Sequence, residues 1–294
     1  MTHIKSLIGC AWFALVSFGG STAWSQQPEP PKGQAAAPEL TEESAWLHGV
    51  FFREISEYQF YLDAKKRQNL VMRGEPALRF PTPTDFWGEI YLWTDRGRAA
   101  VIGSIFEGKR PDGLHLIFHE FHSLSPKPLV AHGGSTGWQP EEEGIKFAPI
   151  PDAAEPAKDA VGRLKQMRDL ADRFHASMVW LGNETDLHLL SEPFYRYELT
   201  DEDSTVVDGA LFAHAAIRSN DPEVIVVIEA QRTKDGVRWH YAPVRFTNRE
   251  AWLKYKGEEV WRVDAGAAGI FDGVTTKRYG VFNVKSIRQD VDEK

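Results

Sequence analysis

One six-residue pattern occurs twice in the sequence. Glu75–Phe80 reads Glu-Pro-Ala-Leu-Arg-Phe, and Glu192–Tyr197 reads Glu-Pro-Phe-Tyr-Arg-Tyr. Each copy contributes one proline and one arginine at matching positions: Pro76, Arg79, Pro193 and Arg196. Repeats of this kind indicate that a chain is built from similar structural units. If that holds here, residues further along the two copies should match as well.

The match continues downstream of both copies at nearly constant spacing. Turn residues and one tryptophan correspond in order: Gly88 with Gly209, Asp112-Gly113 with Asp235-Gly236, and Trp138 with Trp261. Such glycines and large aromatic side chains are positions on which a fold depends. The sequence therefore predicts an internal duplication, with the two tryptophans as paired anchors in the core or at a sheet edge.

Each predicted unit is a helix followed by strands. Thr41 is a good N-cap, and Glu42 and Glu43 favour the positive end of the first helix. The second helix is expected from about residue 157 to 175, where apolar residues recur at helical spacing. Alternation and turn residues predict the strands. They are residues 58–62, 70–72, 90–94, 99–106 and 114–124 in the first unit, and 177–181, 187–190, 210–217, 224–228 and 237–246 in the second.

Two of these strands are apolar on both faces, residues 90–93 and 224–228. A strand of that kind is covered on both sides. One helix covers only one face of a sheet, so the other face needs a second cover. We expect an α+β fold in which each unit is a helix plus an antiparallel β-meander, with the two sheets packed in pseudo-twofold symmetry.

The N-terminal residues 1–25 have the pattern of a signal peptide. Lys5 precedes an apolar run at residues 7–18, and Ala23-Trp24-Ser25 offers small residues for cleavage. The remaining boundaries follow from composition. They are a Pro/Ala-rich spacer (26–40), the first unit (41–139), a Pro/Glu-rich linker (140–156), the second unit (157–262) and a C-terminal extension (263–294).

Charge and cysteine content indicate which partners the protein can bind and in which cellular compartment it is found. The net charge is −8, which argues against nucleic acid as a partner. The one cysteine, Cys10, lies in the predicted signal peptide, so the mature chain would have neither a disulfide nor a thiolate nucleophile. Export without disulfides suggests a bacterial protein, periplasmic or extracellular. No apolar run reaches the ~20 residues that a membrane span needs, so we do not expect an integral membrane protein.

Several stretches carry a resemblance to a known family. They are Tyr58–Phe60, the two Glu-Pro-x-x-Arg-aromatic segments, His119–Ser125, Leu164–Arg168 and Asp208–Ala213. Here the chain resembles an uncharacterised family of exported bacterial proteins, over about Tyr58 to Trp261. The resemblance implies no activity, cofactor or catalytic residue, and the segment after Trp261 is longer than the family leads us to expect.

One dense cluster of potential metal ligands occurs, at His115, His119, Glu120 and His122. On a strand, His115 and His119 share a face but lie about 13 Å apart at 3.3 Å per residue. Zinc–nitrogen bonds of about 2 Å cannot span that distance. Glu120 and His122 could share an ion with further ligands from elsewhere. The aligned positions of the second unit lack these residues, which favours a function for the cluster over a purely structural role.

The repeated anchors favour structural roles. Arginines at matching positions of both units, Arg79 and Arg196, suit an ion pair with Glu75 or Glu192, or a cap on backbone carbonyls. The alternative is that the two arginines together form a site for an anion. Eight tryptophans follow residue 25, and exposed coplanar ones would form a platform for a glycan. No Gly-x-Ser-x-Gly motif or phosphate-binding loop occurs.

These observations favour an exported, non-enzymatic binding or envelope-associated module with no cofactor. Its partner would be an envelope protein or a polysaccharide. One alternative is a metal-assisted hydrolase that uses His119, Glu120 and His122 with a bound metal ion. The other is a glycan-binding protein that uses exposed tryptophans.

Overall fold

The computed structural model describes residues 41–63, 65, 67–81, 86–201, 204–217, 219–266 and 274–289. All of them belong to one compact unit. The predicted signal peptide and spacer, residues 1–25 and 26–40, lie outside the described residues. Below, the first half is residues 41–139, the second half is residues 140–263, and the C-terminal segment is residues 274–289.

Two helices occur among the described residues. Helix α1 spans Glu42–Ile55, and its N-cap Thr41 accepts a hydrogen bond from the backbone N–H of Ser44, which confirms the predicted start. Helix α2 spans Ala160–Ala171 with Asp159 as N-cap. It is shorter than predicted because Phe174 and His175, expected in the helix, begin a strand.

Strands make up most of the remaining structure. The first half contains β1 (Gln59–Tyr61), β2 (Val71–Met72), β3 (Leu78–Pro81), β4 (Phe86–Asp95), β5 (Arg98–Lys109), β6 (His115–Ser123), β7 (Val130–His132) and β8 (Gly137–Trp138). The second half contains β9 (Ala148–Pro149), β10 (Phe174–Trp180), β11 (Asn183–Asp186), β12 (His188–Leu189), β13 (Tyr195–Arg196), β14 (Val206–Ala215), β15 (Pro222–Thr233), β16 (Gly236–Arg245), β17 (Ala251–Tyr255) and β18 (Glu258–Val263). The C-terminal segment contains β19 (Val274–Thr275) and β20 (Tyr279–Ile287).

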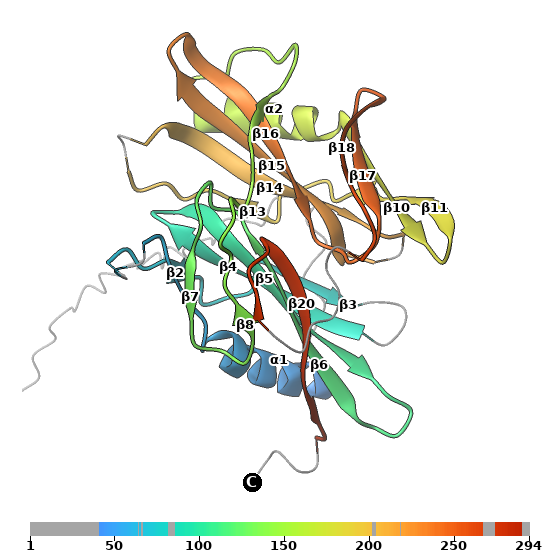
Figure 1. Ribbon diagram of the computed structural model, residues 1–294. Coiled ribbons are helices and arrows are strands. Elements are labelled where there is room, and N and C mark those ends of the chain that lie inside the picture. The colour runs from blue at the N-terminus through green and yellow to red at the C-terminus, as the bar shows by residue number, and fades with distance from the viewer. Residues whose placement is uncertain are drawn as a thin grey trace, which may run out of the picture. The chain divides into compact units, whose positions relative to one another are not determined.

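Two six-stranded sheets contain the longest of these strands (Figure 1). The first sheet has the order β2-β4-β5-β6-β20, and β3 also pairs with β4. The second sheet has the order β12-β14-β15-β16-β9, and β13 also pairs with β14. The sheets thus share an order, but nine-residue β20 occupies the edge that two-residue β9 occupies in the second sheet. The C-terminal segment, predicted as an extension, therefore forms a full strand of the first sheet.

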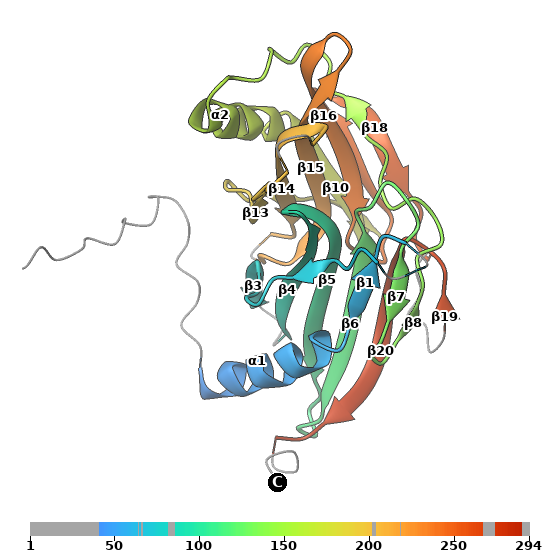
Figure 2. The same ribbon diagram turned by 90° about the vertical axis from the view of Figure 1, so that its left-hand side faces the viewer.

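The predicted α+β fold class is wrong. Of the described residues, 50% lie in strands and 11% are helical, and the architecture consists of several antiparallel sheets with a half-barrel. One reason is a further sheet of order β11-β10-β17-β18, of which β17 and β18 were not predicted. Another is that each helix is short and lies beside strands of its own half, α1 near β4 and α2 near β14 (Figure 2).

Apolar side chains from both large sheets form a shared core. Leu92 and Ile102 of the first sheet belong to the same buried cluster as Leu211 and Val227 of the second. Two further clusters lie under α1 and under α2. Burying one such side chain contributes about 1.5–3 kcal/mol, so this shared cluster is a main reason why the two sheets stay together.

The repeated Glu-Pro-x-x-Arg-aromatic stretch ends in a ring that covers a glycine. Any Cβ at Gly88 would lie 2.1 Å from the Phe80 ring, and one at Gly209 would lie 2.5 Å from the Tyr197 ring. Both distances are far inside van der Waals contact, so only glycine fits under either ring. The stretch therefore determines how closely β3 pairs with β4 and β13 pairs with β14.

A buried ion pair joins the two sheets. Glu229 of β15 is 0% exposed, and Arg98 of β5 donates to it from Nε at 2.8 Å and from Nη2 at 3.3 Å. The Tyr197 hydroxyl donates to the same carboxylate at 2.8 Å, and the Gln231 amide donates at 2.7 Å. Glu229 is thus a buried carboxylate with its own cation and a full set of donors.

Candidate functional site

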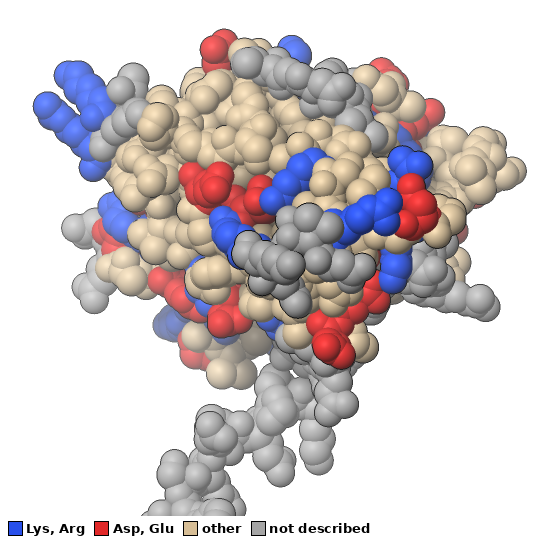
Figure 3. All heavy atoms as spheres, turned by 90° about the horizontal axis from the view of Figure 1, so that it is seen from below, with Lys and Arg blue, Asp and Glu red and all other residues tan. Residues whose placement is uncertain are grey.

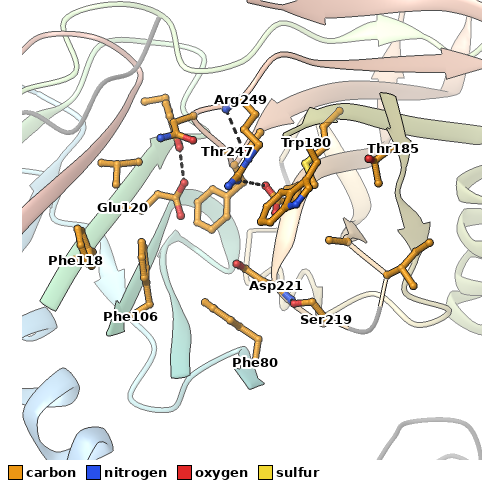
Figure 4. Close-up of a pocket in the computed structure, with 18 residues that line it drawn as sticks. Phe80, Phe106, Phe118, Glu120, Trp180, Thr185, Ser219, Asp221, Thr247 and Arg249 are labelled. Carbon is orange, nitrogen blue, oxygen red and sulfur yellow. Dashed lines mark hydrogen bonds and ion pairs between the residues drawn. The ribbon is translucent and has the colours of Figure 1, made fainter. Parts of the chain in front are cut away.

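A cavity of about 540 Å³ lies between the first six-stranded sheet and the four-stranded sheet β11-β10-β17-β18 (Figure 4). The first sheet contributes side chains from β3, β5, β6 and β20, and the four-stranded sheet contributes side chains from β10 and β11. The remaining ones come from the start of β15 and from the connections β14–β15 and β16–β17. Its lining residues are Phe80, Phe106, Phe118, Glu120, Met178, Trp180, Thr185, Ala216, Ile217, Ser219, Asp221, Glu223, Phe246, Thr247, Asn248, Arg249, Tyr279 and Val281.

The walls of the cavity are mostly aromatic and aliphatic. Phe106 and Phe118 stack with ring centroids 5.2 Å apart and planes 13° apart, and Phe80 lies on the same side (Figure 4). Trp180 lies on the opposite side with Thr185, and Figure 4 shows the polar side chains between these walls. Rings and methyl groups of this kind favour the apolar body of a small molecule.

Glu120 is the acidic group that β6 brings to the cavity. Its residue is 6% exposed, and the Tyr279 hydroxyl donates to Oε1 at 2.5 Å because β20 runs antiparallel beside β6. No other group donates to the carboxyl, so Oε2 has no hydrogen-bond partner among the described residues. Burial raises the pKa of Glu120 to about 8, so the carboxyl is largely protonated at pH 7 in the unliganded protein.

Two further carboxyls approach from the start of β15. Asp221 is half-buried, and the structure shows no hydrogen bond to its carboxyl. Burial, followed by the charges of Glu223 and Glu120, raises the pKa of Asp221 well above its ordinary value. Burial also raises the pKa of Glu223, although Thr247 and Arg249 oppose that shift.

Two arginines lie near the carboxyls, but both are engaged by other groups. Arg249 lies over the Trp180 ring at 3.9 Å from the centroid and 3.8 Å from the Glu223 carboxylate. Arg245 donates to three backbone carbonyls, and its guanidinium lies 5.4 Å from the centre of the Tyr279 ring. Three carboxyls therefore share the field of two guanidiniums, and neither arginine makes a hydrogen bond to Glu120 or Asp221.

The sequence-predicted metal candidates do not converge on one point. Alternation along β6 puts Glu120 on the cavity side and His119 on the other face, where its Nδ1 lies 2.7 Å from the Tyr58 hydroxyl. The Nδ1–H of His122 donates to the Ser123 carbonyl at 2.7 Å. Burial lowers the pKa of each histidine to about 3, so both rings are neutral. Within the described ranges, no group of three or more His, Cys, Asp or Glu side chains is arranged to hold a metal ion.

The repeated arginines form ion pairs, but the predicted partners are not the main ones: Glu75 is a second, more distant partner of Arg79, and Glu192 pairs with Arg168 rather than with Arg196. The Nε of Arg79 donates to Glu89 at 3.1 Å, while Glu75 lies 3.8 Å away. Arg196 pairs with Asp208 at 2.6 Å. Asp208 also accepts from Arg163 of α2 at 2.8 Å, so each repeated arginine anchors its β3- or β13-type strand to a buried acid.

The tryptophans are mostly part of the core. Trp138 is 1% exposed, stacks on Phe121 and donates from Nε1 to the Lys277 carbonyl, whereas its counterpart Trp261 packs at the edge of the cluster under α2. Trp180, 40% exposed, is the most open of the eight that follow residue 25, and it lines the cavity. The predicted glycan platform of several exposed tryptophans is not visible among the described residues.

Sequence reasoning identified Glu120 but missed the other polar groups of the cavity. The sequence indicates a turn at Asn220-Asp221-Pro222 and one possible strand at residues 279–284 of a less regular tail, and neither pattern points to a cavity. One signal was available. Glu223 stands next to a run of five apolar residues, where an acid is costly without a purpose. Arg249, in contrast, carries no sequence signal that distinguishes it from other surface arginines.

The surface gives little further indication of a partner. On the face that Figure 3 shows, Lys and Arg side chains lie among Asp and Glu side chains. Such a mixed surface creates no extended field of one sign that would attract a polyelectrolyte. None of the described helices is both long and apolar enough to span a membrane.

Comparison with known proteins adds no assignment: the chain matches no protein-family model, no curated protein and no solved structure.

Proposed function

We propose that this protein is an exported binding protein that holds a small, largely apolar molecule in the cavity between its first six-stranded sheet and its four-stranded sheet. The observation that carries the proposal is the cavity itself, about 540 Å³ with mainly aromatic and aliphatic walls and a few polar groups gathered together. Volumes of about 300–1,000 Å³ with such a lining are typical of small-molecule sites. Export is inferred from the signal-peptide pattern of residues 1–25.

The composition of the lining favours binding over catalysis. No histidine, cysteine or lysine lines the cavity among the described residues. Those side chains serve most often as general bases or nucleophiles. The nearby His119 and His122 are each held by a hydrogen bond elsewhere. The polar groups that remain suit recognition of one polar group on a ligand.

Exposed apolar side chains mark the route into the cavity. Trp180 is 40% exposed and Ile217 is 67% exposed, and both line the cavity. Leu181, next to Trp180 in the β10–β11 turn, is 86% exposed. Large apolar side chains left open beside a cavity are typical of ligand sites. The ligand would enter between the β10–β11 turn and the β14–β15 connection.

The test is a titration with a neutral, solvatochromic naphthalene probe, which fluoresces when it enters an apolar cavity. Wild-type protein should bind the probe at one saturable site. The Thr185→Phe variant should lose this binding, because Thr185 lines the cavity from β11 and a strand accommodates phenylalanine well.

Val161→Phe is the matched control. Val161 lies on α2, is 79% exposed and does not line the cavity, so the variant adds an aromatic ring at an exposed position. Probe binding should equal that of the wild type. The proposal fails if the wild type has no saturable site, or if Thr185→Phe binds the probe as tightly as Val161→Phe does.

A further inference from the structure

The polar end of the cavity shows which chemical group its ligand carries. Glu120 is more than nine-tenths buried, yet its Oε2 faces the cavity without a partner among the described residues. This oxygen is therefore open to a polar group of a molecule that enters the cavity. The Asp221 carboxyl, which lines the same cavity, accepts no hydrogen bond from the described residues. The carboxyls of Glu120 and Asp221 therefore both have oxygens available to a ligand in the same cavity.

The charge balance around this space depends on whether its acids are ionised, since Glu120 is largely protonated in the free protein at pH 7. Glu120, Asp221 and Glu223 are the acids, and Arg245 and Arg249 are the bases that act on them. Tyr279 is the other titratable group in contact, and its hydroxyl donates a hydrogen bond to Glu120. If all three acids ionise, the two guanidiniums leave one negative charge uncompensated. A ligand with a single positive charge would balance the group.

The aromatic walls favour the same sign of charge. Phe80, Phe106, Phe118 and Phe246 line the cavity, and the Trp180 ring already receives the Arg249 guanidinium on one face. A ring face attracts a cation, and the attraction is stronger when the pair is removed from water. An anionic ligand would instead meet three acids and these ring faces.

We propose that the ligand is a small organic monocation, a protonated amine on an apolar body, whose ammonium group donates to Glu120 Oε2 and to the Asp221 carboxyl. This inference rests on the proposed binding function and narrows its ligand class. The ammonium supplies the donors that these carboxyls lack, while Tyr279 holds Glu120 in position. The apolar body lies against the phenylalanine side of the cavity.

The experiment compares two probes with the same body, phenylbutylamine and phenylbutanol, by isothermal titration calorimetry at pH 7. The amine should bind about tenfold more tightly than the alcohol, which corresponds to about 1.4 kcal/mol. It should also release protons to the buffer, because the neutral carboxyls ionise as the cation arrives. Titrations in two buffers of different ionisation enthalpy measure this release, and the alcohol should give none.

Two variants locate the effect. Glu120→Gln keeps an oxygen for the Tyr279 hydroxyl but loses the charge, so the amine should lose its advantage while the alcohol binds as before. Glu184→Gln is the matched control: Glu184 is exposed on β11 and does not line the cavity, and its variant changes net charge equally. That variant should keep the full preference for the amine.

The outcomes separate the two proposals. If both probes bind equally, or if the alcohol binds more tightly, the cationic ligand class is refuted while the binding function stands. If the preference for the amine survives in Glu120→Gln, the assigned carboxyl is wrong. If neither probe binds and the naphthalene probe also fails, the binding function falls, and this inference falls with it.

Discussion

Glu229 and Glu120 are both buried acids of central strands, but their surroundings differ. Glu229 receives two hydrogen bonds from Arg98, one from Tyr197 and one from Gln231. Glu120 receives one, from Tyr279, and its second oxygen opens into a cavity. A buried charge needs a partner charge and donors. The protein itself provides Glu229 with a partner charge and donors. Glu120 would obtain a partner charge and a further donor from a bound ligand.

The difference indicates two roles: Glu229 stabilises the fold, and Glu120 is available to bind a ligand. Glu229 joins the two sheets through Arg98, so its carboxylate contributes to the folded state itself. Glu120 costs stability in the free protein, which is typical of binding sites that store unsatisfied polar groups. If this view is correct, substitutions at the two places must have opposite effects on the free energy of unfolding.

The largest effect is expected at Arg98. Arg98→Met keeps the aliphatic packing but leaves the Glu229 carboxylate buried without its cation, which should lower the free energy of unfolding by about 3–5 kcal/mol. Urea unfolding measures the loss. Adding Glu229→Gln should recover a large part of it, because the uncompensated charge is then removed. A loss below about 1 kcal/mol in the single variant would show that Glu229 resembles Glu120 after all.

Glu120→Gln should act in the opposite direction, and its effect should depend on pH. Below pH 4.5, the ordinary pKa of the carboxyl, Glu120 is protonated in both the folded and the unfolded state. As pH rises from 4.5 to about 8, the unfolded state loses this proton first, so the wild type loses stability relative to the variant.

At pH 8 the Glu120→Gln variant should be the more stable by about 1–3 kcal/mol, the cost of an unsatisfied buried polar group. Urea unfolding of both proteins at pH 5 and at pH 8 gives the comparison. An advantage of the variant that shrinks as pH rises would contradict the assignment of Glu120 as a protonated, unpartnered acid.

Arg196→Ala tests whether a second cation protects a buried acid. Asp208 would lose Arg196 but retain Arg163 at 2.8 Å and the backbone N–H of Gly209 at 2.9 Å. We expect a loss of about 1–2 kcal/mol, clearly less than for Arg98→Met. Losses of the same size in the two variants would mean that the number of cations at a buried acid does not matter here.

The smallest effect is expected at the entrance of the cavity. Leu181→Ser changes a side chain that is 86% exposed, so the free energy of unfolding should change by less than about 0.5 kcal/mol. Association of the naphthalene probe, followed by stopped-flow fluorescence, should become slower if the ligand enters beside Leu181. An unchanged rate would place the entrance elsewhere.

Local features of the fold were predictable from local sequence. Thr41 caps α1 as expected, and the predicted strands 90–94 and 99–106 lie within β4 and β5, which pair with each other. The apolar residues 224–228 lie within β15 and are fully buried. In each case, residues close in sequence determine the structure through caps, turn residues and alternation.

The cavity was not predictable because its polar groups meet only after folding. Tyr279 reaches Glu120 because β20 pairs with β6, and these strands are far apart in the sequence. Asp221 and Arg249 come from connections whose local patterns predict only turns. The predicted fold class failed for a related reason. β17 pairs with β10, which lies on the other side of two long hairpins, and β18 pairs in turn with β17.

The most direct test follows the carboxyl carbon of Glu120 by NMR through a pH titration, with and without saturating phenylbutylamine. Glu120→Gln assigns the signal. In the free protein the pKa should lie near 8, and the bound amine should lower it markedly, since a cation then lies beside the carboxylate. A pKa near the ordinary 4.5 in the free protein would contradict the account, because Glu120 would then already have its partners.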